Sequence, residues 1–168
     1  MALWKYLPKG RSTEDVDFII TLDGPKSVKP VLLGLKDSPF VEHAQWFYYR
    51  APNGKLIQID FVAQWQAAYF PSAARKVKDI PTGVLPLITP EDLIVSKIFS
   101  CGMRGDKGKS RRDADDAARM LDMVTKSTGH LTLAKHQFDA VQGGLADVIH
   151  HTDHDETWWK TKLGLIAG

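Results

Sequence analysis

The chain has 168 residues, of which 43% are apolar, so it can bury the core of one globular domain, or of a compact core with a small helical appendage. Its 22 Lys and Arg residues nearly balance its 20 Asp and Glu residues, and the net charge of +2 gives no field that implies a nucleic acid or a membrane as partner. The single cysteine, Cys101, excludes an internal disulfide and a thiolate metal site, which is typical of intracellular proteins.

No stretch of the sequence predicts a membrane span or a signal peptide. The apolar runs fall short of the roughly 20 residues that cross a bilayer. The N-terminal "MALWKYLPKG" is short and is interrupted by Lys5, Pro8 and Lys9. We therefore expect a soluble, cytoplasmic protein.

The first predicted element is a strand over residues 15–22, "DVDFIITL", which is rich in β-branched and aromatic residues and stops at the turn "DGPK". A helix over residues 26–36 should follow, with Pro30 tolerated only in its first turn. Four apolar residues at helical spacing should share the buried face of this helix: Val28, Val31, Leu32 and Leu35.

A β-hairpin is the clearest local feature. In "AQWFYYRAPNGKLIQIDFVA", two aromatic or β-branched runs flank "APNG", where Asn53 and Gly54 accept a positive φ. In the second arm, alternation predicts one polar face and one apolar face: the polar face carries Leu56, Gln58 and Asp60, and the apolar face carries Ile57, Ile59 and Phe61.

The second half of the chain predicts mostly helices. The run "VLPLIT" suits a short edge strand, and "TPEDLIVSKIFSCGMR" begins a helix with Thr89 as N-cap and Pro90 at the first position. A basic loop, "RGDKGKSRR", should lead into an antiparallel partner helix starting at "DADDAARMLDMVTK", with further helices near the C-terminus. We expect an α+β fold in which residues 1–88 form the α/β core and residues 89–168 a helical part packed on it.

Two carboxylates lie at the start of the first strand. Asp15 and Asp17 share one strand face, about 7 Å apart along the chain, while Val16 and Phe18 face the core. Such a pair repels unless cations or hydrogen bonds neutralise it, and hard oxygen ligands suit Mg²⁺. Asp60 completes a two-metal site if its strand is adjacent. Alternatively, Asp15 belongs to a turn or cap and Asp17 is merely exposed.

The order of "RSTEDVDFII", "KLIQIDFV" and "LPLITPEDLIVSKIFSCGMRGDKGKSRRDADDAARML" resembles the nucleotidyltransferase superfamily, especially its minimal and abortive-infection toxin-like branches. The resemblance covers roughly residues 10 to 122 and implies a mixed sheet flanked by helices. It also implies that Asp15, Asp17 and Asp60 hold Mg²⁺ (or Mn²⁺) and a nucleoside triphosphate such as ATP. The resemblance further implies that Arg11 and Ser12 lie near the phosphates. Three other residues would lie either near the phosphates or in the helix packing: Lys97, Arg104 and Lys109.

The sequence departs from the family pattern ahead of the first strand. Family members usually carry a Gly-Gly or Gly-Ser pair about ten residues before the first Asp, and this pair grips the triphosphate. Here that stretch reads "MALWKYLPKG", and Gly10 is too close to Asp15 to match. The alternatives are that the first helix is lost or that another element, such as one from a partner chain, replaces it.

Three functions follow as hypotheses. The first is transfer of a nucleoside monophosphate to an acceptor hydroxyl or protein side chain; the acceptor class stays open among small molecules, proteins and RNA. The second is a catalytically inactive nucleotide-binding or protein-interaction member of the same fold, and the third is a metal-dependent phosphodiester hydrolase. As partners we expect a second copy of the chain in a homodimer or, from the resemblance to the toxin-like branch, an antitoxin-like protein.

Several other signals have ordinary structural explanations. The basic loop suits either phosphate contact or a solvated segment beside the acidic helix start. His150 and His154 have helical spacing for Zn²⁺ but acidic, polar neighbours. Trp158 and Trp159 are expected to pack the last helix onto the body or to form a subunit contact, rather than to stack on a base. The aromatic run at residues 46–49 is expected mostly in the core and sheet surface, with the alternative that one ring lines a nucleotide pocket.

Overall fold

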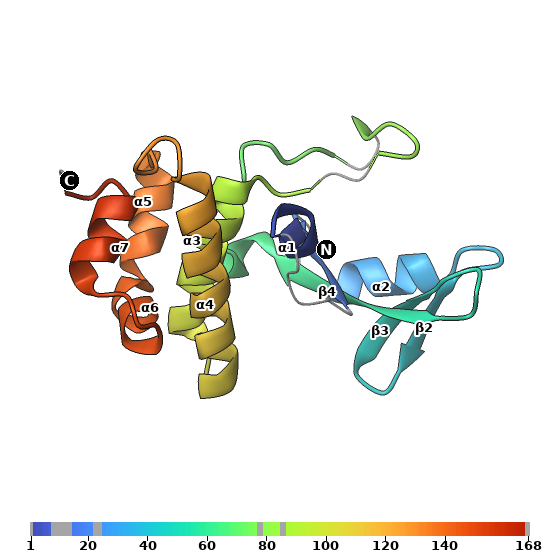
Figure 1. The fold of residues 1–168 in the computed structure, drawn as a ribbon. Helices are drawn as coiled ribbons and strands as arrows, with labels where there is room; N and C mark the ends of the chain where they lie inside the picture. Colours follow the sequence, from blue (N-terminus) through green and yellow to red (C-terminus); the bar gives the residue numbers. More distant parts are fainter. Residues whose placement is uncertain (1, 8–14, 22–24, 77–78, 85–86, 167–168) are drawn as a thin grey trace. The chain divides into compact units, whose positions relative to one another are not determined.

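The computed structural model describes residues 2–7, 15–21, 25–76, 79–84 and 87–166 (Figure 1). The chain divides into two compact units: residues 11–70 form a sheet unit, and residues 2–10 with 71–168 form a helical unit. The division after residue 70 falls inside the range that the sequence assigned to the core. No helix among the described residues combines the length and apolar character needed to cross a bilayer.

The sheet unit contains one four-stranded mixed sheet, which confirms the predicted α+β class. The strands lie in the order β1-β4-β3-β2, with β1 parallel to β4 and the other two pairs antiparallel. Their bounds are Asp15–Ile20 for β1, Phe40–His43 for β2, Trp46–Arg50 for β3 and Leu56–Ala63 for β4. A short 3₁₀ helix, η1 (Gln64–Gln66), follows β4.

One face of the sheet is apolar and carries a chain of aromatic contacts. Ring centroids are 5.5 Å apart for Phe40 and Phe47, and 5.7 Å for Phe47 and Phe61. Phe18 of β1 extends the chain, with its ring 6.1 Å from Phe61. Phe47 is 1% exposed whereas Phe18 is 40% exposed, because β1 is an edge strand with β4 as its neighbour.

Helix α2 (Pro25–Leu33) lies on this apolar face (Figure 1). The Lys29 ammonium is 3.1 Å from the Glu42 carboxylate and 5.5 Å from the centroid of the Phe47 ring. Val31 points away from the sheet and is 65% exposed, so the prediction that Val31 faces the core is wrong. Pro30 lies beyond the first turn, also contrary to expectation.

The prediction that Leu35 lies on the buried face of this helix is also wrong. The helix stops at Leu33, so Leu35 has left the helical phase and is 49% exposed. Gly34 follows directly and closes the last turn, because its N–H donates to the Pro30 carbonyl at 3.0 Å. The buried side of this helix is therefore narrower than the apolar pattern predicts.

The predicted hairpin is confirmed between β3 and β4. Gly54 has a φ of 81° and donates its N–H to the Ala51 carbonyl at 2.8 Å. The Asn53 side chain accepts from the Lys55 N–H at 3.1 Å, while its own backbone keeps a negative φ. Only the glycine uses the left-handed region in this turn.

The helical unit is built around a pair of helices, α3 (Pro90–Met103) and α4 (Lys107–Val124). Ser110 donates to the Cys101 carbonyl, and Lys97 contacts Asp113, so the two helices run antiparallel as predicted. The remaining helices are α1 (Ala2–Tyr6), α5 (Lys135–Gln142), α6 (Leu145–His151) and α7 (Glu156–Lys162). The fully buried side chains include Ile94, Ile98, Met120, Leu121, Val148 and Trp159.

The first turns of α3 and α4 are each capped by a side chain. Thr89 caps α3 by accepting from the Asp92 N–H at 3.1 Å, as predicted. Most of the expected basic loop is instead the first part of α4, because Asp106 caps it by accepting from the Gly108 and Lys109 N–H groups. These two hydrogen bonds lower the pKa of the Asp106 carboxyl.

The sequence predicted a short edge strand over "VLPLIT", just ahead of α3. The described residues of "VLPLIT", residue 84 and residues 87–89, lie in no strand, so the edge strand is not found there. The backbone around Thr89 starts α3 instead.

Trp159 is fully buried and donates its Nε1–H to Thr152 at 3.1 Å, which confirms that it packs the last helix.

Gly144, at the start of α6, sits where α6 meets α3. A Cβ atom there would lie 2.0 Å from the Ile98 carbonyl oxygen, which is backbone and has no easy way to move. Gly144→Ala is expected to lower the free energy of unfolding by about 3 kcal/mol, measured by urea denaturation. Gly105→Ala is the control, because a Cβ there meets nothing within 4 Å and should change stability by less than about 0.5 kcal/mol. Equal effects of the two changes would contradict the packing argument.

Cys101 is a buried thiol with a raised pKa. It is 1% exposed, and burial, with the nearby Asp147 and Asp113 carboxylates, raises its pKa to about 11. At pH 8 the native thiol should therefore react with iodoacetamide at least about 100-fold more slowly than the thiol of the urea-unfolded chain. Mass spectrometry of quenched samples measures this, and rapid native alkylation would show that the thiol is accessible.

Candidate functional site

The pairing of β1 with β4 brings the three predicted carboxylates to one face of the sheet. The two strands are parallel, and Asp17 is the register partner of Asp60 while Asp15 is the partner of Gln58. Register partners in a parallel pair point to the same side, and so do residues two apart on one strand. The face bearing these four residues, opposite to α2, is called the acidic face below.

The carboxylates of the acidic face differ in their surroundings. Asp17 is exposed, while Asp15 and Asp60 are half-buried. The Gln58 amide nitrogen lies 3.1 Å from Oδ1 and 3.0 Å from Oδ2 of Asp60, so it donates toward both carboxylate oxygens. Gln58 therefore fixes the orientation of the Asp60 carboxylate.

The donor set suits a hard divalent cation, but the side chains are not gathered around one point. Carboxylate oxygens are the ligands that Mg²⁺ prefers. Within the described ranges, no three His, Cys, Asp or Glu side chains are close enough together to hold one ion. The face has the chemistry of a metal site, and its carboxylates would have to turn toward a common centre to form one.

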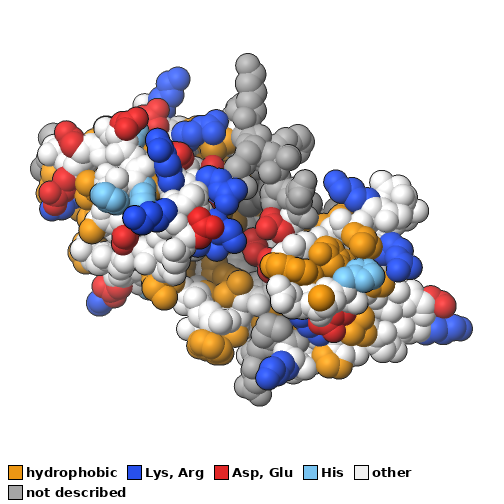
Figure 2. Space-filling view, turned by 90° about the horizontal axis from the view of Figure 1, so that it is seen from below, with side chains coloured by type: hydrophobic (Ala, Val, Ile, Leu, Met, Phe, Trp, Pro, Cys, Tyr) orange, Lys and Arg blue, Asp and Glu red, His pale blue; other side chains and the backbone are white. Residues whose placement is uncertain are grey.

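Gln58 was not among the predicted site residues, although the sequence contained a signal for it. Strand alternation already placed Gln58 on the same side as Asp60. Two aromatic residues of β3 share that side, because Phe47 between them points into the apolar core. These are Trp46, which is 45% exposed, and Tyr48, the register partner of Gln58. The sheet unit in Figure 2 shows acidic, hydrophobic and histidine side chains next to one another.

The predicted basic residues Lys97 and Arg104 lie in the α3–α4 pair. The Lys97 ammonium is 2.5 Å from Asp113 Oδ1 and 3.5 Å from Asp116 Oδ2. Arg104 Nε is 2.9 Å from the other oxygen of Asp113. Both aspartates are buried, so Lys97 and Arg104 neutralise carboxylates inside the helix packing. This corresponds to the packing alternative of the sequence prediction, and a contact with phosphate stays untested.

The other predicted phosphate-binding residues are placed differently. Lys109 is exposed in the first turn of α4, where its backbone N–H donates to Asp106. Arg11 and Ser12 lie outside the described residues. In the view of Figure 2, Lys and Arg side chains of the helical unit are interspersed with Asp and Glu, so this view shows no patch of a single sign.

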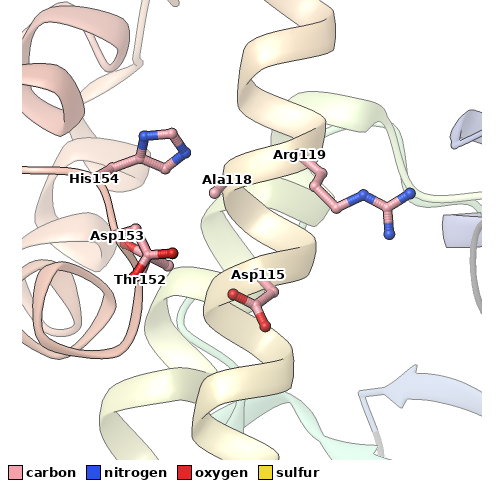
Figure 3. Close-up of a pocket in the computed structure, with 6 residues that line it drawn as sticks. All are labelled: Asp115, Ala118, Arg119, Thr152, Asp153 and His154. Carbon is pink, nitrogen blue, oxygen red and sulfur yellow. The ribbon is translucent and has the colours of Figure 1, made fainter.

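A surface hollow of about 400 Å³ lies in the helical unit between α4 and the segment that joins α6 to α7. Its lining residues are Asp115, Ala118, Arg119, Thr152, Asp153 and His154 (Figure 3). The His154 ring is directed toward α4, whereas Arg119 extends to the opposite side of that helix. His154 also stacks on Trp158 with centroids 3.7 Å apart. The polar groups therefore do not converge on one ligand position.

Comparison with known proteins bears on the fold. No protein-family model matches the sequence, and no curated protein matches it. Among solved structures, the chain is similar to the crystal structure of an antigenic nucleotidyltransferase-like protein from Paracoccidioides brasiliensis, with a TM-score of 0.64 and 21% sequence identity. The match covers 96% of this chain and 82% of the other. The chain therefore has a nucleotidyltransferase-like fold.

Proposed function

We propose that this protein transfers a nucleoside monophosphate from a nucleoside triphosphate such as ATP to an acceptor hydroxyl or protein side chain. The observation that carries the proposal is the parallel pairing of β1 and β4, which sets Asp17 opposite Asp60 with Asp15 on the same face. The nucleotidyltransferase-like fold of the solved relative supports it as an analogy.

Each carboxylate has a role in the proposal. Asp15, Asp17 and Asp60 would hold Mg²⁺ or Mn²⁺. When bound, this ion would neutralise phosphate charge and lower the pKa of a hydroxyl group coordinated to it. Asp60 accepts the proton of the attacking hydroxyl, and Gln58 orients Asp60 for that task. The new bond joins the acceptor oxygen to the α-phosphorus, the bond from that phosphorus to the bridging oxygen breaks, and pyrophosphate leaves.

The phosphates also need cationic and hydrogen-bonding partners. In the proposal, Arg11, Ser12 and Lys109 supply them, because Lys and Arg make most protein contacts to phosphate. Lys97 and Arg104 act indirectly, by holding α3 and α4 together through Asp113. Any acceptor, whether small molecule, protein or RNA, approaches from the acidic face. A second copy of the chain or an antitoxin-like protein is the proposed partner.

Incubation with Mg²⁺ or Mn²⁺ and each of the four labelled nucleoside triphosphates tests the proposal. Transfer predicts pyrophosphate release together with label on a protein, an RNA or an added hydroxyl compound. The choice of label separates transfer from diester hydrolysis, because hydrolysis of a diester releases no pyrophosphate. Absence of pyrophosphate release with every nucleotide and both metals would argue against the proposed reaction.

A second candidate function is favoured by the side-chain arrangement itself. Gln58 donates to both oxygens of Asp60, and within the described residues no three potential ligands gather around one point. Such a face suits a nucleotide-binding or protein-interaction module without turnover. Titration calorimetry with ATP and Mg²⁺ discriminates: binding without pyrophosphate release indicates a nucleotide sensor, and no binding indicates an interaction module.

A further inference from the structure

The acidic face carries exposed aromatic rings beside its carboxylates. Trp46 and Tyr48 project from β3 on this side, and His43 projects from β2 because it is the register partner of Trp46. The rings of His43 and Tyr48 have centroids 5.9 Å apart. Trp46 is 45% exposed, which is a large exposed surface for an indole on a strand.

Register places the exposed indole at the Asp60 end of the sheet. The paired residues of β3 and β4 end at Tyr48 and Gln58. Because the strands are antiparallel, continuing both by two residues beyond this pair leads to Trp46 on β3 and to Asp60 on β4. Asp17 lies one strand further, opposite Asp60. With strands about 4.8 Å apart, Trp46 and Asp17 are separated by about 10 Å across the sheet. A nucleoside triphosphate spans a distance of this order from the centre of its base to its phosphates.

The backbone that carries Trp46 is also held in a defined position. Phe47, the next residue, is 1% exposed and is fixed in the apolar core by its contacts with Phe40 and Phe61. A strand anchored in this way presents Trp46 from a rigid element, and an indole loses little side-chain freedom when it stacks on a ligand.

We infer that Trp46 forms a stacking platform for the nucleobase of the nucleoside triphosphate, while the carboxylates of the acidic face take its metal-bound phosphates. This inference rests on the proposed nucleotide site. It adds that the protein recognises the flat aromatic base of the substrate as well as its phosphates. Stacking uses the π-face that every base has, so the platform selects nucleotides over inorganic polyphosphates but tolerates different bases. Tyr48 and His43 line the β2 side of the platform.

Calorimetric titration of four proteins with two ligands tests the inference. The proteins are wild type, Trp46→Ala, Trp46→Phe and Trp65→Ala, and the ligands are Mg-ATP and Mg-tripolyphosphate. Trp65 is the matched control, because it is an indole of η1 in the same unit, is 77% exposed and follows the end of β4. Circular dichroism and thermal melts check that each variant is folded.

Trp46→Ala is expected to weaken Mg-ATP binding about tenfold and leave Mg-tripolyphosphate binding unchanged, whereas Trp46→Phe, which keeps a ring, should lose less than about threefold. Trp65→Ala should match wild type with both ligands. Unchanged ATP affinity in Trp46→Ala, equal weakening of both ligands, or wild-type ATP binding no tighter than tripolyphosphate binding would overturn the platform alone. Failure of the wild type to bind either ligand would overturn the proposed function and the platform together.

Discussion

Replacing Lys97 with alanine is expected to lower the free energy of unfolding by about 3–5 kcal/mol, the scale of breaking a buried ion pair by removing one partner. Lys97 lies between two buried carboxylates, with Asp113 Oδ1 at 2.5 Å and Asp116 Oδ2 at 3.5 Å. Arg104 stays on Asp113, but the negative charge inside the α3–α4 pair loses its central cation. Urea denaturation followed by circular dichroism measures the change.

Lys109→Ala is the matched control for this experiment. Lys109 is exposed on α4, so its loss should alter stability by less than about 0.5 kcal/mol. The proposed phosphate role of Lys109 predicts weaker nucleotide binding instead. If Lys97→Ala were as stable as wild type and lost only nucleotide affinity, the structural role of Lys97 would be refuted and its phosphate role favoured.

Replacing Asp60 or Asp17 with asparagine is expected to reduce nucleotide transfer by about 100-fold or more in kcat, the scale of removing one group that stabilises transition-state charge. Asparagine keeps the shape of the side chain but loses the negative charge that holds a divalent cation and accepts a proton. For Asp60 the Gln58 amide also loses its charged acceptor. Pyrophosphate release at saturating ATP and Mg²⁺ is the measurement.

The effect should be confined to the acidic face. Asp139→Asn is a suitable control, because Asp139 is an exposed carboxylate of α5 paired with Lys135 at 2.7 Å. It should transfer nucleotide at the wild-type rate. If transfer is lost while circular dichroism shows that the variants are folded, the loss is chemical. Unchanged transfer in both Asp17→Asn and Asp60→Asn would rule out the carboxylate mechanism.

Local patterns in the sequence predicted the parts of the site that depend on one strand at a time. Alternation placed Asp15 with Asp17, and Gln58 with Asp60, on shared faces. Their meeting depends on β1 pairing with β4, a parallel and non-local contact that bypasses two intervening strands. No periodicity within a single segment encodes such a pairing, so the sequence left it open.

Two predictions about helices were wrong for different physical reasons. Val31 matched the apolar spacing of its helix, but the side of α2 that faces the sheet carries Lys29, which contacts Glu42 and the Phe47 ring. The basic run before α4 resembled a loop because of its glycines and charges, yet one capping residue, Asp106, was enough to begin the helix there. Side-chain partners distant in sequence decided the first case, and a local cap that the charge pattern obscured decided the second.

The position of β1 at the edge of the sheet has a consequence for association between molecules. An edge strand offers backbone groups to which a strand of another chain can add, and charged side chains on that strand disfavour such addition. Asp15 and Asp17 are the charged residues of "DVDFII", whose other members are all apolar. The acidic pair therefore also disfavours the addition of another strand at β1, and variants that neutralise both acids need to be compared with wild type at matched concentration and oligomeric state.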